Sequence, residues 1–259
     1  MGALTAPAIA RGDDAISGTA SVGLDLGYID YKEELTPPRK STESGPILAV
    51  QGSFELHVSP TLPWMSLFAT YSASSTHFDG TTNEPVVPTT GTTGNQYFKI
   101  EGRVGYPITS FLDVYAGLGY RSWLRRLDYD EFYSWKFAIV GLRASTDYGV
   151  LLPDLRLRVD GSLRPTFGAS MRLEDYAPNV QPATLDLQSR LGVRIETPID
   201  YRFSPIFFAS LTPYYEFSAL GASDYQTLHY TDGSVYKIAR EPSSTTNQYG
   251  ATASFSYSY

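Results

Sequence analysis

Apolar and polar residues alternate along most of this chain with a period of two. The clearest stretch is Tyr249 to Tyr259, YGATASFSYSY, where every second residue is apolar or aromatic and the residues between are glycine, serine or threonine. This period predicts a β-strand with one apolar and one polar face. The pattern therefore indicates an all-β protein.

Ten segments carry this alternation, at 18–31, 47–58, 64–78, 96–108, 111–127, 132–144, 154–169, 184–197, 206–220 and 249–259. Mostly long, polar connections, at 32–45, 79–95, 128–131, 171–182 and 221–244, alternate with short ones. Tilted strands that cross a bilayer need about 9–11 residues, whereas soluble strands are typically about 5–6 residues long. Length, even number and alternating connections predict a ten-stranded antiparallel up-and-down transmembrane barrel, in which 249–259 pairs with 18–31. A soluble β-sandwich is the alternative.

The apolar faces are expected to meet lipid. In the segment 132–144 this assigns Tyr133, Trp135, Phe137 and Ile139 to the outside, and a bulge near Gly141 is expected to restore the alternation that breaks there.

The polar faces then line the lumen, where Asp25, His57 and Lys136 are also expected. The predicted lumenal charge network comprises Glu55, Lys99, Glu101, Arg103, Asp113, Arg121, Arg125, Arg156, Arg158, Asp160, Arg164, Asp186, Arg190, Arg194, Glu196 and Glu216. Charges on neighbouring strands can form a ladder of ion pairs, and the interior of so small a barrel is nearly filled by side chains. The excess of arginine favours anions in any narrow path. Such a path is expected beside the uncharged Gly, Ser and Thr face of 249–259.

Phe255, Tyr257 and Tyr259 share the apolar face of the closing segment. This ending resembles the closing strand of bacterial outer-membrane β-barrel proteins, whose terminal residue is typically aromatic. The resemblance implies that these three residues act as an insertion signal for the barrel-assembly machinery. It also implies an outer-membrane location, contact with lipid and lipopolysaccharide, and two periplasmic termini.

Composition narrows the possible partners and divides the chain. The net charge of −7 and the absence of a basic stripe argue against nucleic acid. No apolar run is long enough for a transmembrane helix, and the lack of cysteine excludes thiolate chemistry. Ala8-Ile9-Ala10 is similar to a secretory cleavage site. Residues 1–16 are therefore interpreted as a signal remnant or flexible tail, and residues 17–259 as one barrel domain.

The ten-stranded plan resembles, in architecture only, the omptin proteases and the ten-stranded adhesins. His77 and Asp79 form one candidate catalytic pair at the rim, but the order and strand positions depart from the omptin pattern, and no other catalytic motif, metal site or cofactor motif is present. We expect a non-enzymatic surface or structural role with a possible extracellular protein or glycan ligand. The alternatives are a narrow ion or solute channel and a rim hydrolase, either omptin-like or lipid-A-modifying.

Overall fold

The computed structural model describes residues 16–59, 61–81, 86–127, 129–174 and 177–259, so the expected signal remnant lies almost wholly outside the described residues. The described part is all-β. Its strands are β1 (Ser17–Glu33), β2 (Ser41–His57), β3 (Trp64–Thr81), β4 (Pro88–Pro107), β5 (Leu112–Arg126), β6 (Asp130–Ser145), β7 (Leu155–Glu174), β8 (Ala183–Leu187), β9 (Leu191–Glu196), β10 (Ile199–Arg202), β11 (Phe207–Leu220), β12 (Gln226–His229), β13 (Val235–Ala239) and β14 (Ser244–Ser258).

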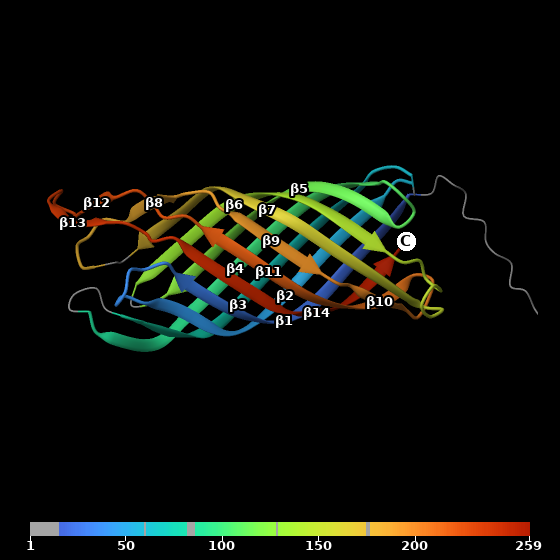
Figure 1. Ribbon diagram of the computed structural model, residues 1–259, viewed down its shortest axis with the longest axis horizontal. Coiled ribbons are helices and arrows are strands. Elements are labelled where there is room, and N and C mark those ends of the chain that lie inside the picture. Colours follow the sequence, from blue (N-terminus) through green and yellow to red (C-terminus); the bar gives the residue numbers. More distant parts are fainter. Residues whose placement is uncertain (1–15, 60, 82–85, 128, 175–176) are drawn as a thin grey trace, which may run out of the picture.

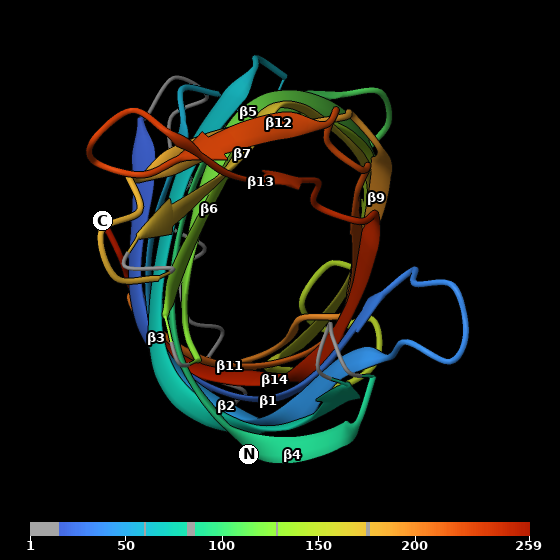
Figure 2. The ribbon, with the colours of Figure 1, turned by 90° about the vertical axis from the view of Figure 1, so that its left-hand side faces the viewer.

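The sheet closes on itself as a barrel (Figure 2). Each strand from β1 to β7 pairs antiparallel with the next, while β8, β9 and β10 are successive pieces of one stave beside β7, and β9 and β10 also pair with β11. β11 pairs with β14, and β14 pairs with β1 from Thr19 opposite Ser258 to Glu33 opposite Ser244. The barrel thus has ten staves, which confirms the predicted strand number and the predicted closing pair.

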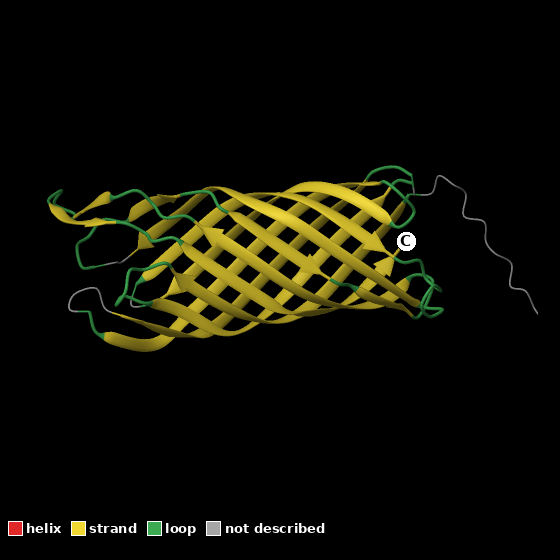
Figure 3. Ribbon diagram, in the orientation of Figure 1, coloured by secondary structure: helices red, strands yellow, loops and turns green. Residues whose placement is uncertain are grey.

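The two ends of the barrel differ. One end, here the loop end, carries the long connections and the β12–β13 hairpin; the other, the turn end, carries the short connections, the start of β1 and the end of β14 (Figures 1 and 3). β2 and β4 begin earlier than expected, within connections predicted to be loops, because strand alternation continues there with polar residues on both faces. The described residues include no helix that is long and apolar enough to cross a membrane.

The outer face is apolar over most of its height. Exposed aliphatic and aromatic side chains cover it on neighbouring staves, among them Val22, Leu24, Leu26, Leu48, Val50, Leu67, Leu118, Val140, Leu163, Ile195 and Leu211. Near the turn end, Phe203, Phe207 and Phe255 form a ring cluster with centroids 5.4–6.4 Å apart. Towards the loop end, Tyr28 and Tyr249 stack at 5.6 Å. Such an apolar band between aromatic groups is typical of barrels that cross a lipid bilayer.

A bulge in β7 exchanges the inner and outer faces of that strand. Trp135 of β6 lies opposite an extra residue of β7, because the pairs Ser134–Ser170 and Lys136–Phe167 flank it, and Gly168 adopts φ +56° there. This left-handed conformation suits glycine. On the turn-end side of the bulge, Arg164 points inward and Phe167 outward. On the loop-end side, the buried residues are Ala169, Met171 and Leu173.

The next stave makes the same exchange. The break at residues 188–190 separates β8, where Leu185 and Leu187 point inward, from β9, where Arg194 points inward and Ile195 outward. The hydroxyl of Thr166 accepts a hydrogen bond from the Arg190 amide at 2.8 Å, which ties this break to the turn-end side of the β7 bulge. Both staves therefore change from a polar to an apolar inner face at the same level.

Strand β6 corrects one sequence expectation. Tyr133, Trp135, Phe137 and Ile139 are all buried in the lumen instead of facing outward, and β6 pairs with β5 without any register shift near Gly141. The alternation is continuous, and the ring of Tyr115 fills the space that a side chain at Gly141 would need. The error arose because apolar residues were assumed to face lipid.

Candidate functional site

The lumen between mid-height and the turn end holds a network of ion pairs. Among the described residues, salt bridges there join eight basic side chains to six carboxylates; we call this set the ion network. Its members are Lys99, Arg103, Arg121, Arg143, Arg156, Arg158, Arg164, Arg194, Glu55, Glu101, Asp160, Glu196, Asp200 and Glu216. They come from seven different staves, so the network cross-links the barrel through its interior.

Two buried glutamates are the hubs of the ion network. Glu216 contacts four cations: Arg194 at 2.7 Å, Lys99 at 3.3 Å, Arg164 at 3.8 Å and Arg121. Glu101 accepts bonds from Arg164 at 2.6 Å and from Arg103 at 2.8 Å. A buried carboxylate is stable only when its charge is compensated in this way, so the inward position of the polar face depends on these pairings.

Aromatic rings complete the packing near the turn end. The Arg143 guanidinium lies 4.1 Å from the ring centroid of Trp64 and donates to Glu55 at 2.9 Å. The Trp64 indole donates to Asp113 at 3.1 Å. These contacts combine cation–π attraction with charge pairing, and they occupy the lumen where the predicted residues Glu55 and Asp113 lie.

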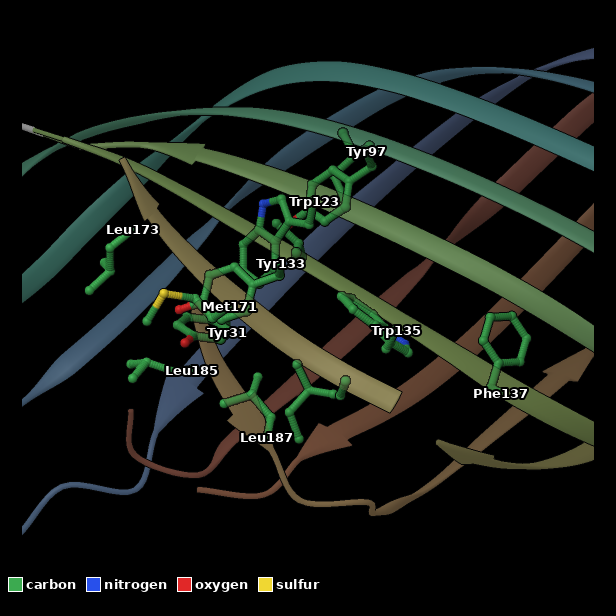
Figure 4. Packing of buried hydrophobic residues seen from close by; sticks show 14 of the residues in the cluster. Tyr31, Tyr97, Trp123, Tyr133, Trp135, Phe137, Met171, Leu173, Leu185 and Leu187 are labelled. Atoms are coloured by element: carbon green, nitrogen blue, oxygen red, sulfur yellow. The ribbon is translucent and has the colours of Figure 1, made fainter. Parts of the chain in front are cut away.

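A second closure lies towards the loop end and is mainly aromatic. We call this closure the aromatic plug; it consists of Tyr31, Tyr97, Trp123 and Tyr133. The three tyrosine rings surround the ring of Trp123 at centroid distances of 5.0–5.4 Å (Figure 4). Arg125, only 1% exposed, lies 4.6 Å from the Tyr31 centroid. It pairs with Glu131 at 2.5 Å and with Glu43 at 3.0 Å.

A small cavity lies inside the ion network. Its volume is about 110 Å³, and on one side it is bounded by an uncharged wall of serine and threonine from β1, β2, β3, β11 and β14. Adjacent hydroxyls of this wall are bonded to one another, as between Ser21 and Ser256 at 2.7 Å. The cavity therefore lies against the small-residue face of the closing strand, where the sequence places any path.

A larger space opens at the loop end. This vestibule, with a volume of about 1190 Å³, is lined by Met171, Leu173 and Leu185 together with charged residues such as Arg39 and Arg240. None of its lining residues also lines the smaller cavity. The aromatic plug and the part of the ion network nearest the loop end lie between the two spaces.

Glu241 reaches into the vestibule from the short connection between β13 and β14. Its carboxylate accepts a hydrogen bond from Tyr133 at 2.7 Å, and Ser223 bonds its backbone amide at 2.9 Å. Burial, followed by the carboxylates of Glu33 and Glu131, raises the pKa of the Glu241 carboxyl well above its usual range. The docked loop thus favours the protonated form of Glu241.

Three residues expected in the lumen lie elsewhere. Asp186 and Arg190 are exposed on the outside, because the break at 188–190 changes which alternate residues of the stave face inward. Lys136 is also exposed, on the outward face of β6 opposite Tyr120, because the inward residues of that strand are the aromatic ones. The other predicted network residues, and Asp25, lie on inward faces, and His57 bonds Glu55 at 2.9 Å.

The candidate rim pair is not assembled. His77 is exposed on the outward face of β3, and Asp79 pairs instead with Lys40 across to the start of β2. Because both side chains lie on the outer wall, they do not face a pocket in which a water could be activated. Within the described ranges, no group of three or more His, Asp or Glu side chains is placed to hold a metal ion.

Several residues of the two closures were not found from the sequence. Glu43 and Glu131 fell in segments interpreted as loops, Asp200 in a turn, and Arg143 beyond the supposed break in its strand. Arg143 could have been found, because continuous alternation from Glu131 places both on one face. Glu241 carried no such signal, since it lies outside any strand.

Comparison with known proteins gives resemblance in structure but none in sequence. No family model and no curated protein matches the chain. Neisserial surface protein A is 8% identical with a TM-score of 0.36, covering 91% of this chain and 95% of its own. The translocator domain of the autotransporter NalP from Neisseria meningitidis is 8% identical, with a TM-score of 0.41 and coverage of 93% and 88%.

A third solved structure, Ail of Yersinia pestis in complex with the heparin analogue sucrose octasulfate, is 8% identical, with a TM-score of 0.30 and coverage of 93% and 99%. The chain is similar in structure to barrels of bacterial outer membranes. Its own strand pairing establishes the ten-stranded closure.

Proposed function

We propose that this chain is a bacterial outer-membrane barrel with a closed lumen whose loop end contacts partners outside the cell. The observation that carries the proposal is the separation of the two lumenal spaces, which share no lining residue. Side chains of the aromatic plug and the ion network lie between them. A barrel closed in this way presents its loop end as its functional surface, and among the described residues His77 and Asp79 do not form the catalytic pair that a rim hydrolase would need.

The outer face supports a membrane location. Tyr257 lies eight positions after Tyr249 on the outward face of β14. This spacing corresponds to about 26 Å along the strand and roughly 20 Å along the axis of a barrel with strands tilted about 40°. This height is close to the apolar band of about 25 Å in outer-membrane barrels. In this placement the turn end, with the start of β1 and the end of β14, faces the periplasm. Lipid and lipopolysaccharide surround the apolar band.

The β12–β13 hairpin is the surface best suited to contact a partner. It exposes Val235 and Ile238 by 62% and 67%, and Tyr225 beside it by 73%. Exposed apolar and aromatic groups at the tip of a rigid scaffold are typical of binding sites for proteins or glycans. We expect their joint replacement by serine to abolish binding to a glycan array or to immobilised extracellular-matrix proteins. Replacement of Thr81 by serine serves as the control.

Single-channel recording in planar bilayers tests the closed lumen. We expect no steady conductance from the purified barrel, because the plug and the ion network leave no shared space. Steady current steps would sink the proposal and favour the second candidate, a narrow channel, which the cavity beside the small-residue wall supports. In that case replacement of Arg156 or Arg158 would change the current.

Single cysteines test the membrane placement, since the chain contains none of its own. A membrane-impermeant maleimide added to intact cells is expected to label Asp186→Cys, on the polar outer face near the loop end. Leu163→Cys, on the apolar band, is expected to remain unlabelled. Equal labelling of the two variants would contradict a bilayer around the band.

A further inference from the structure

At the loop end, the start of β4 projects beyond one of its two neighbouring strands. On one side β4 pairs with β3 up to Pro88, which lies opposite Thr81. On the other side its pairing with β5 ends at Gly94, which lies opposite Arg126. Among the described residues, no strand pairs with this side of residues 88–93, which we call the open edge. A stretch of this length extends over about 20 Å.

The open edge lacks the features that usually protect an unpaired strand. Its sequence, PTTGTT, contains no charged residue, and over this described range it pairs with β3 without a bulge. Its one proline, Pro88, is its first residue, and Thr90, Gly91 and Thr92 are exposed. Alternate residues of such an edge direct their backbone N–H and C=O groups away from the sheet, where another strand can pair with them.

Gly91 leaves space for a foreign side chain beside the open edge. It lies opposite Phe78, which lines the vestibule. No atom of a non-neighbouring residue lies within 4 Å of the position that a Cβ atom would take at Gly91. Leu127, which follows the last residue of β5, also lines the vestibule. A strand added to the open edge would continue the line of β5, so its inward side chains would meet this apolar part of the vestibule.

A second copy of the barrel does not fit the open edge in the proposed membrane placement. Copies in one membrane have the same orientation, and a two-fold axis that relates them is parallel to the membrane normal. Strands tilted by about 40° then cross at roughly 80° and rise in the same direction, so two open edges cannot form a ladder with each other. The open edge therefore fits a segment of another polypeptide.

We propose that the open edge binds an extended segment of a partner polypeptide, which joins the sheet as a strand antiparallel to β4. The main-chain hydrogen bonds provide affinity, and the alternating side chains provide specificity. Polar residues of the segment face outward beside Thr90 and Thr92. Apolar residues face inward, and one large aromatic or aliphatic side chain lies against Gly91 and Phe78.

The open edge belongs to the loop end, so its binding of a partner rests on the proposed function and narrows the partner there to a polypeptide. It is a different surface from the β12–β13 hairpin. Joint replacement of Val235, Ile238 and Tyr225 by serine should therefore leave strand addition intact. Loss of binding at one surface does not remove binding at the other, so the two proposals fail separately.

Fluorescence anisotropy with a labelled peptide tests strand addition to the purified barrel in detergent. The probe is the end-blocked heptapeptide Thr-Val-Thr-Phe-Thr-Val-Thr, which alternates polar and apolar residues. The comparison peptide has the same sequence with every backbone nitrogen methylated, so it keeps the side chains but cannot donate main-chain hydrogen bonds. We expect saturable binding of the first peptide only. Equal binding of both peptides, or binding of neither, would overturn the proposal.

Gly91→Leu tests the predicted side-chain position. The new side chain fills the space against Phe78, so the affinity for the probe should fall about 5-fold, and a peptide with Ala in place of Phe should lose less. Gly52→Leu is the matched control, because a Cβ atom there also meets no neighbour within 4 Å and the residue is exposed on β2, away from the open edge. Equal losses for the two peptides would refute the assigned side-chain position.

Amide hydrogen exchange locates the added strand. Alternate amides of residues 89–93 should exchange more slowly with the probe bound, because they then donate hydrogen bonds to it. Protection confined to the β12–β13 hairpin would place the peptide on the other surface and reject the open edge. A concentration-dependent barrel dimer that the probe dissociates would identify a second copy as the occupant, and the proposal would likewise be rejected.

Discussion

The loop end and the turn end of this barrel are filled in opposite ways. Towards the loop end the lumen contains Trp123, Met171 and Leu185, while the outer face carries polar residues such as Arg172 and Asp186. Towards the turn end the lumen contains the ion network and the outside is apolar. The first arrangement is that of a soluble barrel, and the second is that of a membrane barrel.

In the proposed membrane placement, the difference follows from what surrounds each level of the barrel. Where lipid covers the outside, alternation leaves only the polar half of each strand for the lumen, and charge must be paired there. Where water covers the outside, the apolar half can pack inward as in any soluble protein. One chain contains both solutions because the β7 bulge and the neighbouring break exchange the two faces.

The largest expected effect is on the charged half. Glu216→Ala leaves four cations without their shared carboxylate, and removing one partner of a buried ion pair costs about 3–5 kcal/mol. Urea unfolding in lipid vesicles, followed by the difference in gel migration between folded and unfolded forms, measures this loss. A loss below about 1 kcal/mol would mean that water compensates these charges and that the ion network is not needed for stability.

Substitutions in the apolar lumen towards the loop end should cost less stability, and the cost should come from lost packing. Leu185→Ala deletes buried methyl groups beside the vestibule, where neighbours can relax, so a cost of about 2–3 kcal/mol is expected. Leu185→Met keeps the volume and should cost less than about 1.5 kcal/mol. If both variants lose equal stability in the same urea assay, side-chain volume does not hold this region together.

A substitution at the boundary between the two halves, the β7 bulge, should cost still less stability. Gly168→Ala forces an alanine into a left-handed backbone conformation, at a cost of about 1–2 kcal/mol. No atom lies near enough to clash with a side chain at Gly168 or at Gly161, but only Gly168 has a positive φ. Gly161→Ala is therefore the control and should be nearly neutral. Equal effects would show that the bulge does not depend on the glycine conformation.

The smallest expected effect is a pH dependence of loop docking. Since the pKa of Glu241 is raised in the docked state, its contribution to docking is complete below the ordinary glutamate pKa and is lost as pH rises through the raised value. Arg125 and Tyr133 oppose this shift, and Glu33 and Glu131 support it. Hydrogen exchange of residues 221–243 should quicken at higher pH beyond the intrinsic change. Glu241→Gln should remove this extra change, and persistence in the variant would assign it to another group.

Sequence alternation was sufficient to predict the barrel, its ten staves and the closing pair. It was also sufficient to place most of the ion network, because residues such as Arg103, Arg164 and Arg194 lie opposite apolar neighbours that face outward. The period of two is a direct consequence of strand geometry, so it survives wherever the two faces differ in polarity.

The failures occur where that difference disappears or reverses. Pro88–Asn95 is polar on both faces, so its strand could not be told from a loop. Asp186 was placed on the wrong side because the break at 188–190 exchanges the two faces of its stave, and Trp135 because the inward residues of β6 are aromatic instead of polar. Glu241 depends on tertiary contacts of a loop, which alternation cannot predict.

The bulge at Gly168 also fixes a length. On β7 the outward apolar residues end at Phe167, and polar ones begin at Ser170, so the bulge marks how thick a bilayer this stave matches. Moving it by two residues would change that thickness by about 6–7 Å along the strand, and the bilayer would have to thin, thicken or tilt the barrel in response. In the proposed membrane placement, this single glycine thus helps to match the protein to the thickness of the bilayer.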